Sequence, residues 1–320
     1  MSEATLIRSN AAIIRDGLER CRTGERVALA TVAFTWGSSP RPAGSVMIIT
    51  DSGYSSGSVS GGCIEEELFE LVKNDFPSEC RVIEYDAETT KTLPCGGKLQ
   101  LIVEPIEGLE NPDELVDELS SGKPLERIIS IKDNSSRWTL EIGKAQSAIS
   151  DDVFVIHYDS AWKVLIVGFS DLGRHVSMFA QMLDYKVSVC EPRKEFRHMD
   201  SISSLSISDS YPDDFIREGG CDEQTAVLAL THDPKVDDLA VIEAIETNAF
   251  YIGALGSKRT AKKREQRLIE HFGFTNDQLS RVKGPIGLDL RTRKVNEIAL
   301  AVMADVTACR NNVEVGTQRL

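Results

Sequence analysis

The first part of the chain alternates between helical and strand-like patterns of apolar residues. Apolar side chains recur at helical spacing near the start, and Thr23 and Gly24 end this pattern. Further along, β-branched runs separated by turn residues indicate strands. The predicted elements are helices over 5–22 and 64–73 and strands over 26–35, 45–50 and 99–104. We therefore expect an N-terminal α+β domain over residues 1–108.

The pattern weakens over residues 109–160. A short acidic helix is predicted over 111–121, and the apolar runs that follow predict strands over 128–131, 138–142 and 153–156. We expect this segment to be the tail of the first domain and a connector.

The pattern becomes regular again over residues 161–320, where short apolar runs alternate with amphipathic segments. The strands are expected over 163–167, 186–190, 226–231 and 250–252, and the helices over 172–183, 236–247, 257–272 and 294–309. Alternation of this kind is typical of βαβ units around a parallel sheet. With right-handed crossovers, it predicts a Rossmann-like, doubly wound α/β domain.

Composition narrows the function classes. A length of 320 residues favours two domains, and 36 basic against 50 acidic residues give a net charge of −14, which argues against general nucleic-acid binding. No apolar run approaches the roughly 20 residues that cross a membrane. The seven cysteines form neither a regular framework nor a Cys-x-x-Cys motif, which disfavours disulfides and a structural zinc site. We expect a cytoplasmic protein with reduced thiols.

The turn after the strand over 163–167 is a candidate dinucleotide site. Gly168 and Gly173 match the first and last glycines of a Gly-x-Gly-x-x-Gly loop, but Ser170 replaces the middle one. Glu191 stands where an acidic residue usually holds ribose hydroxyls. Because a serine crowds the approach to pyrophosphate, NAD(P) binding is doubtful. A Rossmann-like fold with no bound dinucleotide is an equal alternative.

Two cysteines lie beside paired glycines, in Gly61-Gly62-Cys63 and Cys95-Gly96-Gly97. Backbone of this kind can approach a ligand closely, and the predicted helix after Cys63 favours its thiolate. Soft thiolates suit sulfur transfer and soft metals. The alternative is that each behaves as a small buried apolar residue, which we accept for the other five cysteines.

Further polar residues are candidates for ligand contact. Arg41 lies in a proline-rich loop as a candidate anion clamp, with a solvated surface arginine as the alternative. His232 and Asp233 end a strand at the expected ligand edge of the parallel sheet, either as general acid or base or as a helix cap.

A cation-rich helix start is the last candidate. Six cations fall within residues 258–267, after a glycine turn in which Ser257 is a natural N-cap. A phosphate could dock on Gly256, Ser257 and Arg259. The alternative is a solvated helix face.

In this order, the motifs resemble the xanthine dehydrogenase accessory proteins of XdhC/CoxI type, which are molybdenum-cofactor chaperones. The matching segments are RPAGSVM at 41–47, GSVSGGCIE at 57–65, CGG at 95–97, VEP at 103–105, EPR at 191–193, THD at 231–233, YIGALGS at 251–257, GPIGLD at 284–289 and EIA at 297–299. They span nearly the whole chain. Two segments depart from the family pattern. Ser170 and Asp171 stand where relatives usually have Gly-His, and residues 291–295 replace a turn that contains Gly and Pro.

The resemblance implies a cysteine-bearing domain before a Rossmann-like one, with Cys63 and Cys95 as molybdenum ligands or sulfur relays. It also implies binding of molybdenum cofactor, support of its sulfuration and delivery to a xanthine dehydrogenase-like hydroxylase, with a cysteine desulfurase as a second partner. The alternatives are an NAD(P)-dependent oxidoreductase and a non-catalytic docking protein. The sequence leaves open the client, the cofactor form and the oligomeric state, for which a homodimer is one candidate.

Overall fold

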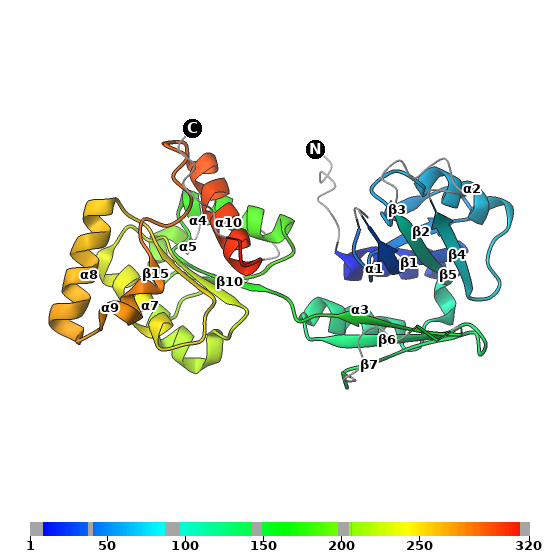
Figure 1. Ribbon diagram of the computed structural model, residues 1–320, viewed down its shortest axis with the longest axis horizontal. Helices are drawn as coiled ribbons and strands as arrows, with labels where there is room; N and C mark the ends of the chain where they lie inside the picture. Colours follow the sequence, from blue (N-terminus) through cyan, green and yellow to red (C-terminus); the bar gives the residue numbers. More distant parts are fainter. Residues whose placement is uncertain are drawn as a thin grey trace. The chain divides into compact units, whose positions relative to one another are not determined.

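The chain divides into two compact units, residues 1–160 and 161–320 (Figure 1). The structure, a computed structural model, describes residues 9–37, 41–86, 97–142, 149–150, 152–197, 205 and 207–313. Each unit has its own hydrophobic core, so each is described by itself.

The first unit is built on an antiparallel sheet in the order β3-β2-β1-β5-β4. Its strands are β1 (Val27–Trp36), β2 (Val46–Thr50), β3 (Ser55–Gly57), β4 (Arg81–Asp86) and β5 (Lys98–Pro105). The strands expected over 26–35, 45–50 and 99–104 are confirmed. Strands β3 and β4 were not anticipated from the sequence.

Helices cover both faces of this sheet. Leu68 of α2 (Glu65–Asn74) packs with Ala30 on one face, and Ile14 of α1 (Asn10–Arg22) packs with Leu29 on the other. The first helix begins later than expected, because Ser9 is its N-cap and accepts a hydrogen bond from the Ala12 amide at 3.3 Å. Residues 1–8 lie outside the described residues.

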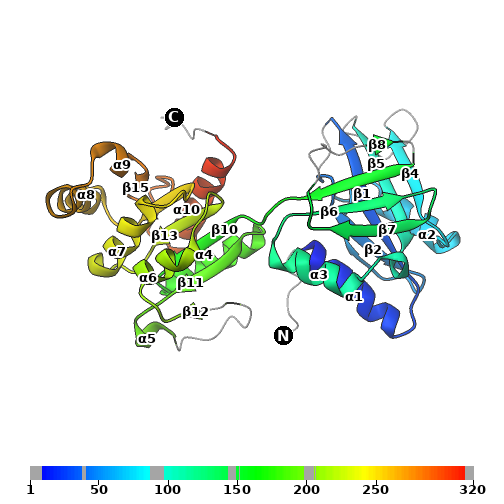
Figure 2. The ribbon, with the colours of Figure 1, turned by 90° about the horizontal axis from the view of Figure 1, so that it is seen from below.

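The segment expected as a tail and connector forms a second antiparallel sheet, in the order β7-β6-β9-β8 (Figure 2). Its elements are η1 (Ile106–Gly108), α3 (Pro112–Ser121), β6 (Leu125–Ser130), β7 (Ser135–Thr139), β8 (Ile149–Ser150) and β9 (Val153–Tyr158). The strand expected over 138–142 lies earlier, because a turn with Asn134 at φ 47° pairs Ser130 with Ser135.

Apolar and charged contacts join the two sheets of this unit. Ile129 and Phe154 of the second sheet pack in one cluster with Ile102 of the first. Beside this cluster, the buried guanidinium of Arg127 forms an ion pair with the buried carboxylate of Glu104 and donates to Thr31 Oγ1 at 2.9 Å. The two sheets therefore share one interior.

The second unit holds a parallel sheet in the order β12-β11-β10-β13-β14-β15. Its strands are β10 (Lys163–Val167), β11 (Lys186–Cys190), β12 (Ile207–Ser208), β13 (Thr225–Ala229), β14 (Tyr251–Ala254) and β15 (Val282–Lys283). Numbered within the sheet, this is the 3-2-1-4-5-6 order of dinucleotide-binding folds. The prediction of a Rossmann-like doubly wound domain is confirmed.

Helices cover both faces of the parallel sheet, so its strands are apolar on both sides. The helices are α4 (Asp171–Met182), α5 (Lys194–Arg197), α6 (Pro212–Phe215), η2 (Ile216–Gly220), α7 (Pro234–Ile245), α8 (Lys258–Phe272), α9 (Asn276–Ser280) and α10 (Val295–Arg310). In β10, Val164 and Ile166 pack toward α4 and α10, whereas Leu165 and Val167 pack toward α7, α8 and α9. Within the described part of the chain, no helix is both long enough and apolar enough to cross a bilayer.

Candidate functional site

The loops that carry the candidate residues of the first unit leave one edge of its sheet. Strand pairing places the end of β1 beside the start of β5, the end of β3 beside the start of β2, and the end of β4 beside the start of β5. The loops 37–45, 58–64 and 87–97 therefore begin or end along that edge. They carry Arg41, then Gly61, Gly62 and Cys63, then Cys95, Gly96 and Gly97.

The first and third of these loops touch at their bases. A Cβ atom built on Gly37 would lie 3.6 Å from the Cα atom of Gly97. Arg41 is half-buried and has interaction partners. Cys95 and Gly96 lie outside the described residues, so their predicted roles stay predictions.

The loop before α2 is wrapped around the carboxylate of Glu65. The backbone amides donate to it at 2.9–3.2 Å, and two hydroxyls donate as well. These donors are the amides of Val59, Ser60, Gly62 and Ile64 and the hydroxyls of Ser58 and Ser60. Gly61 and Gly62 have φ values of 76° and 110°, which glycine adopts without strain and which turn the amides inward.

This cage keeps Glu65 ionised. Burial alone would raise the pKa of Glu65, but the hydroxyls of Ser60 and Ser58 and the Ser60 amide lower it to about 2. The amide of Cys63 donates to Ser60 Oγ at 3.0 Å, so Cys63 is positioned by the same network. We expected the amides before this helix to favour the Cys63 thiolate. In the structure, Glu65 and Ser60 occupy them.

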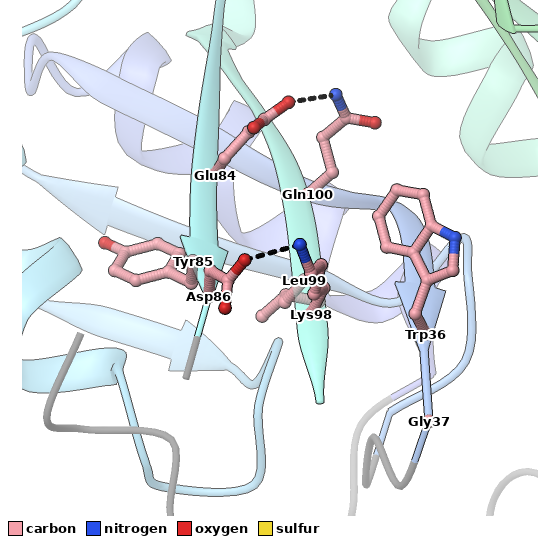
Figure 3. A pocket seen from close by; sticks show the side chains of 8 residues that line it. All are labelled: Trp36, Gly37, Glu84, Tyr85, Asp86, Lys98, Leu99 and Gln100. Carbon is pink, nitrogen blue, oxygen red and sulfur yellow. Dashed lines mark hydrogen bonds and ion pairs between the residues drawn. The ribbon is translucent and has the colours of Figure 1, made fainter. Parts of the chain in front are cut away.

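A pocket opens where β1 and β4 end and β5 begins, beside the bases of the loops 37–45 and 87–97 (Figure 3). It has a volume of about 570 Å³ and is lined by Trp36, Gly37, Glu84, Tyr85, Asp86, Lys98, Leu99 and Gln100. The ammonium group of Lys98 lies 2.6 Å from a carboxylate oxygen of Asp86. None of these side chains was singled out from the sequence.

In the second unit, the Gly168 turn lies between β10 and β13, where the strand order reverses. A Cβ on Gly168, which has φ 102°, would lie 2.8–2.9 Å from atoms of Thr231, and a Cβ on Gly173 would lie 2.2 Å from the Gly168 carbonyl oxygen. Both glycines are therefore required by packing within the protein itself. Ser170 is the N-cap of α4, and its buried hydroxyl has no partner among the described residues.

Glu191 faces into this turn. The Phe169 amide donates to it at 2.7 Å, and the guanidinium of Arg193 donates to both carboxylate oxygens at 2.8 Å. Burial alone would raise the pKa of Glu191, but the hydrogen bonds from Arg193 and Phe169 hold it below its usual value. The acceptors that a ribose would need are thus already engaged. Arg193, whose side chain the sequence does not single out, also donates to the Thr231 carbonyl at 3.0 Å.

The segment after β13 is held by a buried aspartate. Asp237 accepts hydrogen bonds from the amide and hydroxyl of Thr231 at 3.0 and 2.7 Å, and burial raises the pKa of Asp237. Asp233 caps α7 by accepting from the Lys235 amide at 2.9 Å, which was one of the two expected roles. His232 is exposed, with φ 63°.

The cation-rich helix start lies at the same edge of the sheet, after β14. Ser257 caps α8 by accepting from the Thr260 amide at 3.2 Å, Gly256 has φ 146°, and Arg259 is exposed. Arg264 donates to Asp238 of α7 at 2.8 Å, so part of the basic run is used inside the fold. Phosphate binding by Gly256, Ser257 and Arg259 stays a prediction.

Cys63 is half-buried, whereas Cys80 and Cys190 are buried. Over the parts of the chain that the structure describes, no group of three or more His, Cys, Asp and Glu side chains could hold a metal ion.

Models of protein families match both units. The model described as the XdhC and CoxI family matches residues 21–86, and the model described as the XdhC Rossmann domain matches residues 164–306.

Relatives match along nearly the full length. The chain is 26% identical over 319 residues to a protein of Escherichia coli (strain K12) named molybdenum cofactor insertion chaperone PaoD, with 98% of this chain and 92% of that protein covered. It is 23% identical to a probable xanthine dehydrogenase subunit of Bacillus subtilis (strain 168), with 91% and 95% covered. A crystal structure named as a xanthine dehydrogenase from Bacillus halodurans has the same fold, with a TM-score of 0.72, 20% identity and 96% and 98% covered. Matches to both units, in this order, show that the chain belongs to the XdhC and CoxI family.

Proposed function

We propose that the chain binds molybdenum cofactor as cargo, supports its sulfuration and delivers it to a molybdenum hydroxylase of the xanthine dehydrogenase type. The observation that carries this proposal is the convergence of the loops with Arg41, Cys63 and Gly97 on one edge of the first sheet. The name of the Escherichia coli relative, a molybdenum cofactor insertion chaperone, supports the same function.

The loops contribute different chemical groups to the proposed site. Cys63 and Cys95 supply thiols, the softest ligands available in a protein, to the metal centre or to a transferred sulfur. Arg41 supplies a fixed positive charge, and the paired glycines leave room for the cofactor to approach the backbone. The terminal sulfur comes from a cysteine desulfurase as the second partner. The edge of the parallel sheet at Gly256, Ser257 and Arg259 receives a phosphate or nucleotide portion.

The alternative of an NAD(P)-dependent oxidoreductase has less support. The strand order is that of dinucleotide-binding folds, but Glu191 is engaged by Arg193 and Phe169, and Ser170 stands in place of the middle glycine of the loop. A docking protein that bridges a hydroxylase and a sulfurtransferase would need no cofactor of its own.

The test is to purify the chain from cells that make molybdenum cofactor and to measure bound molybdenum and pterin per chain. We expect the wild type to carry both molybdenum and pterin, and we expect Cys63→Ala to lose most of this bound load. Cys221→Ala, which removes a cysteine of the other unit, is the matched control and should retain the load. Full hydroxylase activation without any bound molybdenum or pterin would favour the docking protein. Light scattering on the same samples tests the candidate homodimer.

A further inference from the structure

The pocket at the end of β1, the end of β4 and the start of β5 lies on one face of the first sheet. Trp36 pairs with Lys98, which pairs with Asp86, and Phe34 pairs with Gln100, which pairs with Glu84. Because residues two apart on a strand share a face, these two rows lie side by side on one surface. The neighbouring side chains Tyr85 and Leu99 pack into the core on the opposite face.

One wall of the pocket is aromatic. The indole of Trp36 is 45% exposed, which is unusual for a side chain of this size. The ring of Phe34 lies 4.2 Å from it, centroid to centroid, and supports it. An exposed indole that is held in place offers a flat surface on which a planar ring can stack.

Next to this wall lie a shielded hydrogen-bond acceptor of Gln100 and the exposed carboxylate of Glu84. Gln100 Nε2 donates to one carboxylate oxygen of Glu84 at 2.9 Å, and the Gln100 carbonyl oxygen is directed to the side on which Trp36 lies (Figure 3). The carboxylate of Glu84 is exposed to solvent, whereas the Gln100 carbonyl oxygen is shielded from solvent and has no donor among the described residues. An unpaired acceptor of this kind is costly, so a ligand that brings N–H groups gains by pairing with it.

The charges that line the pocket also favour a ligand that donates hydrogen bonds. Glu84 and Asp86 contribute two carboxylates to the pocket, and Lys98, which pairs with Asp86, contributes its single ammonium group. A phosphate would be repelled here, whereas a neutral ring that donates hydrogen bonds would be attracted. Phosphate groups of a ligand would have to lie outside this pocket.

We propose that the pocket binds a pterin ring, with Trp36 stacked on the ring and Glu84 and Gln100 accepting hydrogen bonds from its 2-amino-4-oxopyrimidine edge. The choice of pterin over other rings rests on the proposed function, since guanine carries the same edge. The structure thus assigns the cofactor's ring to the first unit and leaves the thiols of the neighbouring loops for the metal end.

Calorimetric titrations with free ring compounds test this assignment. We expect 6-hydroxymethylpterin to bind at least about tenfold more tightly than 6-hydroxymethyllumazine, which has an oxygen in place of the 2-amino group. Glu84→Gln should weaken pterin about tenfold and abolish this preference. Trp36→Ala should weaken both rings, and Trp36→Phe should restore most of the affinity. Glu70→Gln, an exposed acid on α2, is the matched control.

The outcomes separate this inference from the proposed function. Equal binding of pterin and lumazine, or tighter binding of guanosine than of pterin, would overturn the assignment of the ring. Normal molybdenum and pterin loading in Trp36→Ala and Glu84→Gln cells would also overturn it and leave the proposed function standing. Selective pterin binding in titrations, with no molybdenum recovered from cells, would overturn the proposed function alone.

Discussion

The two glycine-rich turns of the molecule are each closed by a glutamate of the chain itself, but with different partners. Glu191, in the second unit, is fully buried and paired with the guanidinium of Arg193. Glu65, in the first unit, is only partly buried, and its hydrogen-bond partners within the described residues are neutral hydroxyls and amides. Each has a cysteine close by in sequence, Cys190 next to Glu191 and Cys63 two residues before Glu65.

The different partners give the two glutamates different roles, although each closes a glycine-rich turn. A buried ion pair locks the Rossmann turn and takes the acceptors that a dinucleotide would use. A carboxylate held by neutral donors shapes the cysteine loop while Cys63 stays half-exposed. The Gly168 turn is therefore held closed by the ion pair, whereas the loop around Glu65 leaves the thiol of Cys63 partly accessible.

The largest effect is expected from breaking the ion pair of the second unit. Arg193→Met leaves the buried carboxylate of Glu191 without its cation, which should lower the free energy of unfolding by about 3 kcal/mol. Arg217→Met, at an ion-paired arginine that is 57% exposed, is the control and should change it by less than about 0.5 kcal/mol. Urea denaturation measures the unfolding free energy of both variants. Equal losses would show that the pair of Arg193 and Glu191 stabilises the fold no more than an exposed ion pair does.

The two cysteines should differ in reactivity. Burial raises the pKa of Cys190 to about 12, and its thiol donates to the Ser210 carbonyl at 2.9 Å. Iodoacetamide at pH 8 should therefore modify Cys63 about a hundredfold faster than Cys190, because only thiolates react. Peptide mass spectrometry over time gives both rates. Comparable rates in the folded protein would contradict the difference between the two turns.

The cage around Glu65 should make stability depend on pH. Its pKa is about 2 in the folded chain against an ordinary 4.5, so the carboxylate stabilises the fold fully above pH 4.5 and loses this effect as the pH falls toward 2. The wild type should exceed Glu65→Gln by about 2 kcal/mol in unfolding free energy at pH 6, with the gap closing at pH 3 and below. Glu66→Gln, on the exposed face, should show no such trend. A gap that is independent of pH would exclude the cage as its cause.

The smallest effect is expected at the Rossmann turn itself. Ser170→Gly restores the missing glycine, but Arg193 and the Phe169 amide still occupy the carboxylate of Glu191. We therefore expect neither the wild type nor the variant to bind NAD or NADP in the micromolar range by calorimetry. Tight binding by the variant would show that Ser170 alone excludes the dinucleotide.

Most of the regular elements could be predicted because their apolar periodicity is long enough. Short or half-exposed strands were missed. In β4, Glu84 is exposed while Tyr85 is buried, and the strand exists because it pairs with β5 along its whole length. Such pairing depends on contacts between residues distant in sequence, which periodicity does not contain.

The candidate site was predictable as residue types but not as an arrangement. Gly61, Gly62 and Cys63 stood out because glycines flank a thiol, yet only strand pairing brings their loop to the edge where Arg41 and Gly97 lie. The role of Glu65 was missed, although serines five and seven residues before a glutamate at a helix start are a signal for hydrogen bonds back into the loop.

The buried pair of Arg127 and Glu104 decides where the chain can be divided. A fragment that ends at residue 108 removes Arg127 and the whole second sheet. It therefore exposes the face of the first sheet that carries Glu104 together with the apolar side chains of Ala33 and Ile102, and loses the free energy of burying them. We therefore expect the second sheet to be an obligatory part of the first unit, residues 1–160.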